Sequence, residues 1–423
     1  MKASISKSEI KGRVTAPSSK SYTIRAVMCA ALACGESEIR RPLNSDDTEA
    51  ALKVLSQIGV HSYRTNPPEA DWFVTGGTFR QPELDLFCSD SAATLRFMTA
   101  ICTLVPGRCR LVPGTSLSRR PAGPLLEALK QLGVSCSQDK TGAVTVVGGK
   151  LKGGTTELPG NVSSQYVSAL LLISPLAESG MNMRLTTPME SQPYVLMTID
   201  CLKRFGIKVT YSPDLRQFNT SPQTYASARY NVEGDWSSAS YLLALGALSG
   251  EIQVRNLNPK SLQGDRLILD LLRDMGAAIE IAGNSVTVKK SSLTGICADL
   301  SDSIDLLPTL AVLAAGARGV SQFDGIARAR LKESNRVTAV SEGLGRMGIA
   351  VTEKENRLNI IGGIPKGALI DSQGDHRIAM AFGILGTAVG NTVIKSAECV
   401  TKTYPEFWDV LKKVGGKVAM NGQ

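Results

Sequence analysis

Positively charged side chains stand where apolar helices are predicted to begin. They are Lys20 and Arg25 in SSKSYTIR, Arg96 at the end of SDSAATLR, and Arg377 in GDHRIAMA. Burying a cation is costly unless it meets an anion. One such cation usually pairs with a protein carboxylate, but several at corresponding places favour an external anion. The net charge of +9 also favours an anionic partner, either nucleic acid or a small phosphorylated substrate.

Two acidic side chains could act together with these cations. Asp305 stands in an otherwise apolar stretch, and Glu333 lies between Lys332 and Arg336 in RARLKESNRV. The bland alternatives are a helix cap for Asp305 and a solvated helix face for the charged segment. As a base among cations, Asp305 would stay ionised, because neighbouring positive charges favour the carboxylate. Lys402 precedes Thr-Tyr-Pro, which predicts a turn.

Hydroxyl, amide and guanidinium donors occupy similar places in other segments. Serines at such positions are either N-caps or donors to a ligand. The residues are Ser163, Ser164 and Gln165 in SSQYVSAL, Arg120 before a proline that could open a helix in SRRPAGPL, and Ser191 and Tyr194 in SQPYVLM.

The composition excludes several classes of protein. The 423 residues are 43% hydrophobic and 20% charged, which is typical of folded chains and suggests two or three domains. The longest apolar runs, about 12 residues, are too short to span a bilayer, and MKASISKSEIKG lacks the apolar region of a secretory signal. Nine cysteines without a C-x-x-C pair, and two histidines, His61 and His376, argue against disulfides, a metal site and a Ser-His-Asp triad. We therefore expect a cytoplasmic protein.

A sixfold repeat of about 70 residues predicts the elements that position these side chains. One helix type is amphipathic and ends at a glycine that supplies a left-handed residue. The second type is apolar nearly all round, which predicts burial, and opens with polar residues. The glycines that end the first type are Gly59, Gly133, Gly206, Gly276, Gly348 and Gly415, and those that end the second are Gly35, Gly107, Gly180, Gly250, Gly319 and Gly390.

The polar openings of the apolar helices give the repeat a possible function. Helix N-termini carry unpaired N–H groups and a partial positive charge, so several that meet would bind an anion. The alternative is that the repeat is purely architectural. Six units could form one ring or two groups of three, and residues 3–6 could pair with the last unit, which would make one domain discontinuous.

The motifs together resemble those of the 5-enolpyruvylshikimate-3-phosphate synthases. PSSKSYTIRA is similar to the P-G-S-K-S-x-S-x-R opening of that family, and RRPAGPLLEAL, SSQYVSALL, VEGDWSSASY, LKESNR, GDHRIAMAF and KTYPEF resemble later motifs, over residues 10 to 410. The resemblance implies an inside-out α/β barrel of two domains, each of three βαβαββ units around buried helices. It places residues 1–18 and 232–423 in one domain and 19–231 in the other, with hinges near 14–20 and 228–235.

The resemblance also implies a reaction and roles for the residues above. The enolpyruvyl group of phosphoenolpyruvate would move to the 5-hydroxyl of shikimate 3-phosphate through a tetrahedral intermediate, in a monomer with no cofactor, metal or nucleic acid. Catalytic roles fall on Asp305 as base, Glu333 as acid and Lys20, with His376 handling protons or supporting the site. The phosphoenolpyruvate set is Lys20, Arg96, Arg120, Gln165, Arg336, Arg377 and Lys402. The shikimate 3-phosphate set is Lys20, Ser21, Arg25, Ser163, Ser164, Gln165, Ser191, Tyr194, Asp305 and Lys332.

The chain departs from the family pattern at four positions. Asp90, Ala92 and Ala93 stand where Asn, Gly and Thr are common, and Arg328 replaces a frequent Asn. Because the methyl group of Ala92 would crowd a ligand longer than phosphoenolpyruvate, we expect low sensitivity to the inhibitor glyphosate.

Three other functions stay open from the residues alone. The sister enzyme that acts on UDP-N-acetylglucosamine opens with Lys-Asn rather than Lys20-Ser21 and carries a loop cysteine, for which Cys109 is the candidate. A repeat protein that clamps nucleic acid would spread its cations over outer faces. An RNA 3′-phosphate cyclase would need a reactive histidine, for which His376 is the candidate.

Overall fold

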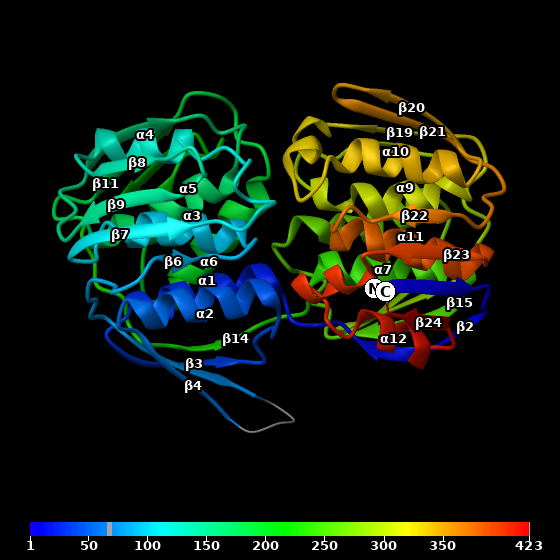
Figure 1. Ribbon diagram of the computed structural model, residues 1–423, viewed down its shortest axis with the longest axis horizontal. Helices are drawn as coiled ribbons and strands as arrows, with labels where there is room; N and C mark the ends of the chain where they lie inside the picture. The colour runs from blue at the N-terminus through cyan, green and yellow to red at the C-terminus, as the bar shows by residue number, and fades with distance from the viewer. Residues whose placement is uncertain (66–69, 423) are drawn as a thin grey trace. The chain divides into compact units, whose positions relative to one another are not determined.

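The computed structural model describes residues 1–65 and 70–422. The chain forms two compact units, which we call the terminal unit (Met1–Pro17 with Gly234–Gln423) and the middle unit (Ser18–Glu233) (Figure 1). Among the described helices, none is long and apolar enough to cross a membrane.

Within the described residues, each unit contains three four-stranded sheets of one design, in which a parallel pair is followed by two antiparallel strands. In the middle unit, the strand orders are β14 (Arg229–Asn231), β3 (Gly35–Arg40), β5 (Trp72–Gly76), β4 (His61–Arg64); β6 (Leu86–Phe87), β7 (Gly107–Val112), β9 (Val144–Gly148), β8 (Ser135–Gln138); and β10 (Gly154–Leu158), β11 (Met181–Leu185), β13 (Gln217–Thr220), β12 (Thr210–Tyr211).

Two of the three described sheets of the terminal unit contain a strand from the start of the chain. Their orders are β16 (Ala278–Ala282), β17 (Ser285–Lys289), β15 (Gly250–Arg255), β2 (Ile10–Thr15); β18 (Cys297–Asp299), β19 (Val320–Asp324), β21 (Arg357–Ile361), β20 (Ala350–Lys354); and β22 (Leu369–Asp371), β23 (Thr392–Lys395), β1 (Lys2–Ser6), β24 (Lys417–Asn421). Strand β1 pairs antiparallel with β24, with Ser4 opposite Ala419. The predicted pairing of the first strand with the last repeat is therefore confirmed.

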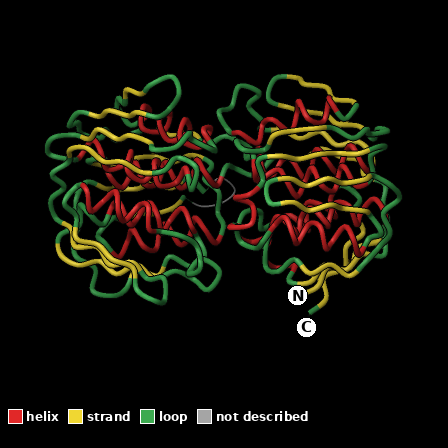
Figure 2. Tube along the Cα trace, turned by 90° about the horizontal axis from the view of Figure 1, so that it is seen from above, coloured by secondary structure: helices red, strands yellow, loops and turns green. Residues whose placement is uncertain are grey.

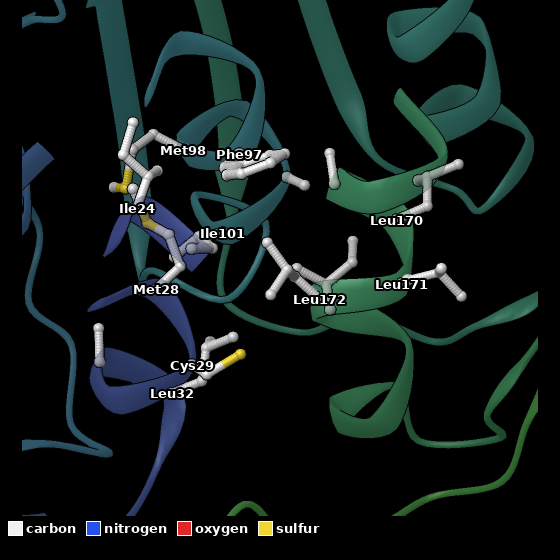
Figure 3. Packing of buried hydrophobic residues seen from close by; sticks show 14 of the residues in the cluster. Ile24, Met28, Cys29, Leu32, Phe97, Met98, Ile101, Leu170, Leu171 and Leu172 are labelled. Carbon is white, nitrogen blue, oxygen red and sulfur yellow. The ribbon is translucent and has the colours of Figure 1, made fainter. Parts of the chain in front are cut away.

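Six apolar helices are buried, as their composition predicts. Residues on every side of α7 are buried because its sequence, WSSASYLLALGALS, has no charged face to present to water. These helices are α1 (Lys20–Leu32), α3 (Ala92–Ile101), α5 (Ser164–Ile173), α7 (Trp236–Ser249), α9 (Leu307–Ala315) and α11 (His376–Val389). In the middle unit, α1, α3 and α5 contribute side chains to one buried apolar cluster, in which Leu172 of α5 points toward the other two helices and Leu171 points to the opposite side (Figure 3).

The amphipathic helices bury only one face, and Figure 2 shows how helices and strands are layered within each unit. They are α2 (Asp46–Gln57), α4 (Gly123–Gln131), α6 (Gln192–Arg204), α8 (Ile268–Asp274), α10 (Arg336–Arg346) and α12 (Phe407–Lys413). The glycines predicted to stop them are left-handed, as at Gly133 (φ 82°) and Gly348 (φ 82°). This expectation is therefore confirmed.

Some predicted helix ends were wrong. Helices α3, α5 and α9 end at Ile101, Ile173 and Ala315, several residues before the glycines expected to stop them. After α5, Pro175 lies in a short 3₁₀ helix, η1 (Ser174–Leu176), because proline cannot continue the hydrogen-bond pattern. Helix α4 begins at Gly123, so Pro124, and not the proline next to Arg120, lies in its first turn.

Candidate functional site

In the middle unit, Lys20 at the start of α1 is held by the first turn of α2. Its Nζ lies 2.8 Å from Oδ2 of Asp47, whose side chain is 6% exposed. The backbone carbonyl of Asp47 also accepts a hydrogen bond from Thr94 of α3 (3.3 Å). Asp47 thus links the starts of two buried helices and fixes the ammonium group of Lys20. The acidic first turn of α2 was visible in the sequence, but its partner was not predicted.

Arg25 lies one turn further along α1 and is 2% exposed. Its guanidinium donates to Thr198 Oγ1 (2.8 Å) and to the backbone carbonyls of Ser21 (2.9 Å) and Tyr194 (3.0 Å). All of these acceptors are neutral, and burial lowers the pKa of Arg25. Within residues 1–65 and 70–422, no carboxylate forms an ion pair with it. A buried cation without a countercharge is a strong attractor for an anionic ligand.

Arg96 joins α3 to the start of α5. Its Nη1 donates to Gln165 Oε1 (2.6 Å) and to Ser163 Oγ (3.2 Å), and its guanidinium carbon lies 5.1 Å from the ring centre of Tyr166. The hydroxyl of Tyr166 donates to the carbonyl of Pro121, next to Arg120. The structure thus brings together residues predicted from three separate motifs.

The serines of this cluster lie at helix starts. Ser163 is the N-cap of α5 and accepts a hydrogen bond from the backbone N–H of Gln165 (3.3 Å), and Ser164 is the first helical residue. Ser191 caps α6 with a left-handed backbone (φ 56°) and is buried. A left-handed non-glycine residue is uncommon and often marks a functional turn.

Asp90 has a structural role within the middle unit. Its Oδ1 accepts hydrogen bonds from the backbone N–H of Ser116 (2.9 Å), the hydroxyl of Ser116 (2.8 Å) and the backbone N–H of Leu117 (3.1 Å). This carboxylate therefore orders the loop that leads to Arg120. Ala92 is the first residue of α3 and is 8% exposed.

In the terminal unit, a single arginine organises the charged residues. Arg336 is 1% exposed at the start of α10, where its guanidinium lies 2.7 Å from Asp305, 2.5 Å from Glu333 and 2.8 Å from Asp375. Burial lowers the pKa of Arg336, but the three carboxylate charges outweigh burial and raise it. Sequence analysis predicted three of these four residues and missed Asp375.

Asp305 lies in a 3₁₀ helix, η3 (Ile304–Leu306), so it is not an N-cap. Besides Arg336, its oxygens lie 3.2 Å from Arg377 Nη2 and 3.4 Å from Lys332 Nζ. Burial raises the pKa of this carboxyl, but the charges of Arg377, Lys332 and Arg336 bring it well below its usual range. Asp305 is therefore ionised, as predicted for an acid among cations.

The remaining predicted residues of this unit surround the same group. Lys402 Nζ lies 3.9 Å from Glu333 Oε1, at the end of the 3₁₀ helix η5 (Ala397–Lys402). His376 is 1% exposed, with Nδ1 3.7 Å from Asp375. The segment RARLKESNRV forms the 3₁₀ helix η4 (Ala327–Leu331), a short connection and the start of α10, so a single solvated helix face is ruled out.

The structure also bears on whether the chain could hold a metal ion or use a reactive cysteine. Within the described ranges, no group of three or more His, Cys, Asp or Glu side chains could hold a metal ion. Cys109 lies on β7 and is fully buried, so it does not provide the reactive loop cysteine of the sister enzyme.

Comparison with known proteins agrees with this arrangement. The family model described as EPSP synthase (3-phosphoshikimate 1-carboxyvinyltransferase) matches residues 5–411. A protein named 3-phosphoshikimate 1-carboxyvinyltransferase from Dehalococcoides mccartyi is 52% identical over 419 residues, covering 99% of each chain. One of the same name from Halobacterium salinarum is 40% identical over 430 residues, covering 98% of this chain and 99% of that one.

Solved structures give the same result for the fold. The EPSP synthase from Acinetobacter baumannii superposes with a TM-score of 0.82 at 26% identity, covering 99% of this chain and 100% of the other. The predicted two-domain inside-out α/β barrel with six repeats is therefore confirmed. Since the family model spans nearly the whole chain and a full-length relative is 52% identical, this protein belongs to the EPSP synthase family.

Proposed function

We propose that the protein transfers the enolpyruvyl group of phosphoenolpyruvate to the 5-hydroxyl of shikimate 3-phosphate and releases phosphate. The observation that carries the proposal is Arg25, a buried cation bonded only to neutral oxygens. Such a group favours a phosphorylated ligand held by the middle unit. The names of the relatives supply the transferred group and the acceptor.

Each proposed set of substrate ligands contains residues of both units. In the middle unit, shikimate 3-phosphate contacts Arg25 and the hydroxyl groups near it. The proposed ligands of this substrate are Lys20, Ser21, Arg25, Ser163, Ser164, Gln165, Ser191, Tyr194, Asp305 and Lys332. Phosphoenolpyruvate contacts the guanidinium and ammonium groups of Lys20, Arg96, Arg120, Arg336, Arg377 and Lys402, together with Gln165.

The chemistry is an addition followed by an elimination. Asp305 removes the proton of the 5-hydroxyl, whose oxygen forms a bond to C2 of phosphoenolpyruvate while Glu333 gives a proton to C3. In the tetrahedral intermediate, C2 carries both the new ether oxygen and the phosphate. The carboxylate of Glu333 then takes a proton back from C3, which restores the double bond as the C2–O bond to phosphate breaks. Fixed cations stabilise the anionic oxygens of the intermediate without reorganisation.

The charges around Asp305 connect binding to this chemistry. In the free protein, three cations hold the pKa of Asp305 low, which makes the carboxylate a weak base. A bound anion shares Arg377, Lys332 and Arg336 with Asp305 and so raises the affinity of this carboxylate for a proton. Substrate binding therefore makes Asp305 a stronger base for the removal of the 5-hydroxyl proton.

We further propose that the protein acts as a cytoplasmic monomer, without nucleic acid or cofactor. We also propose residues 1–18 with 232–423 and 19–231 as the two domains, with hinges near 14–20 and 228–235.

A phosphate-release assay tests the function. The protein is mixed with phosphoenolpyruvate and either shikimate 3-phosphate or UDP-N-acetylglucosamine. Release with shikimate 3-phosphate alone supports the proposal, and Arg25→Gln should raise the KM for that substrate strongly. The matched control is Arg273→Gln, an exposed arginine paired with Asp270 on the surface of α8, which should behave as the parent. Release with UDP-N-acetylglucosamine alone would refute the proposal.

A further inference from the structure

The proposed chemistry does not use one buried acid, Asp265, whose turn is hydrogen-bonded to the turn that carries Asp305. Asp265 belongs to the 3₁₀ helix η2 (Gly264–Leu267) and is 2% exposed. Its Oδ2 accepts a hydrogen bond from the hydroxyl of Ser237 in the first turn of α7. Its Oδ1 has no hydrogen-bond partner in the described part of the chain. A buried carboxylate with an unsatisfied oxygen is costly, so its presence calls for an explanation.

A hydrogen bond connects the turn that contains Asp265 to the turn that contains Asp305, the proposed base. The hydroxyl of Ser303 donates to the backbone carbonyl of Gly264 (2.8 Å), which immediately precedes Asp265. Ser303 is also the N-cap of η3, which carries Asp305. One hydrogen bond thus holds the turn of Asp265 against the turn of Asp305.

The positive charge of Arg377 also acts on both acids. Burial raises the pKa of Asp265 most, the negative charges of Asp305 and Asp235 raise it further, and Arg377 and the Ser237 hydrogen bond oppose them, leaving it at about 6. Arg377 forms an ion pair with Asp305 at 3.2 Å. Its positive charge therefore helps to keep both carboxylates ionised.

Among the other charged groups on the neighbouring elements, Asp235 adds to the negative charge near Asp265. From α7, Asp235 caps the helix by accepting from Ser238 N–H (2.7 Å). From α8, Asp270 and Arg273 pair with each other at 2.9 Å, with both side chains 49% exposed. Arg266, the next residue in η2, is half-buried. The electrostatic influence on Asp265 thus comes mainly from Asp305, Asp235 and Arg377.

We propose that Asp265 is a positioning residue that takes up a proton from solvent when an anion binds Arg377. The bound anion adds negative charge close to Asp265 and offsets the positive charge of Arg377. Protonation of Asp265 removes one buried negative charge, so that Asp305 remains the only ionised acid of the pair. This inference rests on the proposed function only for the identity of the anion as phosphoenolpyruvate.

Proton counting at equilibrium tests the proposal. Phosphoenolpyruvate alone, which does not turn over, is titrated into the protein by calorimetry in two buffers that differ in ionisation enthalpy. At pH 7, the parent should take up several tenths of a proton more than Asp265→Asn, because the free carboxyl is mostly ionised at that pH. The difference should vanish at pH 5, where Asp265 already carries its proton. Ionisation of the ligand itself cancels in this difference.

Affinity gives a second readout that a merely structural role would not move. From pH 6 to pH 8, the Kd of the parent for phosphoenolpyruvate should rise several-fold more than that of Asp265→Asn, which mimics the protonated acid. Asp265→Asn should therefore bind the anion more tightly than the parent at pH 8. Asp270→Asn is the matched surface control and should follow the parent.

A further variant tests the hydrogen bond between Ser237 and Asp265. Ser237→Ala keeps the carboxylate but removes its hydrogen bond, so the proton uptake should move to higher pH. Equal proton counts in the parent and Asp265→Asn would overturn the proposal. If the parent released no phosphate from phosphoenolpyruvate in the presence of shikimate 3-phosphate, the proposed function would be wrong, and the same counts with sulfate, a tetrahedral dianion like the phosphate group, would test Asp265 separately.

Discussion

Replacing Asp305 with asparagine tests the proposed base most directly. Asn has nearly the same size and keeps one oxygen as an acceptor, but it cannot take the proton of the 5-hydroxyl. Loss of a general base costs about 10²–10⁴ in turnover, or about 3–5 kcal/mol of activation free energy. Because Asp305 also competes with anionic ligands for Arg336, Arg377 and Lys332, the affinity for phosphoenolpyruvate should stay the same or improve. The expected signature is thus a fall in kcat without a rise in KM.

The same substitution should lower stability in a pH-dependent way. The side chain of Asp305 is 14% exposed and contacts three cations, and breaking a buried ion pair costs about 3–5 kcal/mol. Since the folded-state pKa of Asp305 is lowered, this stabilisation is present above its unfolded pKa of about 3.9 and is lost as the pH falls through the folded-state value. The free energy of unfolding of Asp305→Asn should therefore be lower than that of the parent at pH 7, with a smaller deficit near pH 3.

Single-turnover phosphate release and urea denaturation measure the two effects. Asp270→Asn, on the exposed surface of α8, provides the control for removal of an acid. Near-normal turnover of Asp305→Asn would show that another group takes the proton. A stability deficit of equal size at both pH values would show that the ionised carboxylate does not hold the cations together.

Further perturbations test other parts of the site. Lys20→Met should weaken phosphoenolpyruvate binding as well as turnover, and should lower the free energy of unfolding by about 1–3 kcal/mol because buried Asp47 loses its ion pair with Lys20; unchanged affinity for phosphoenolpyruvate would exclude Lys20 from its binding. If shikimate 3-phosphate draws the two units together, small-angle scattering should show a smaller radius of gyration with the ligand; an unchanged radius at saturation would contradict closure. Ala92→Gly should be more sensitive to glyphosate than the parent at equal phosphoenolpyruvate saturation, because the methyl group is removed at the first turn of α3; equal inhibition would exclude a steric role of Ala92.

The repeat and the burial of its helices could be predicted from the sequence because both depend on local patterns. An apolar helix followed by glycine is visible within one window of residues, and so is a serine before the helix. The pairing of distant strands within a sheet was harder to predict from the sequence. Strand β14 pairs with β3, for example, although the two strands lie almost 200 residues apart. Only the pairing of the first strand with the last repeat was anticipated.

The sequence predicted the cations of the site, but not the residues with which these cations form hydrogen bonds. Arg25 and Arg336 stand in recognisable motifs, but their contacts are non-local: Thr198 is 173 residues from Arg25, and Asp375 is 39 residues from Arg336. Asp375 was readable as a helix cap before His376, and it does accept the backbone N–H of Arg377 (2.9 Å). Nothing in the local pattern shows that its other oxygen accepts from Arg336 as well.

The two units hold their buried cations in opposite ways, and the difference bears on how each responds to a ligand. Arg25 is surrounded by neutral oxygens, so the middle unit bears the cost of desolvating a charge until an anion arrives. Arg336 is already neutralised by three carboxylates, so an anion in the terminal unit must compete with groups of the protein. An anion that binds Arg25 in the middle unit would therefore relieve an electrostatic cost. An anion that binds near Arg336 in the terminal unit would instead redistribute the cations among the carboxylates and the ligand. The low proton affinity of free Asp305 follows from that second arrangement, since the cations proposed to bind the substrate are the same ones that keep this carboxylate, the proposed base, ionised.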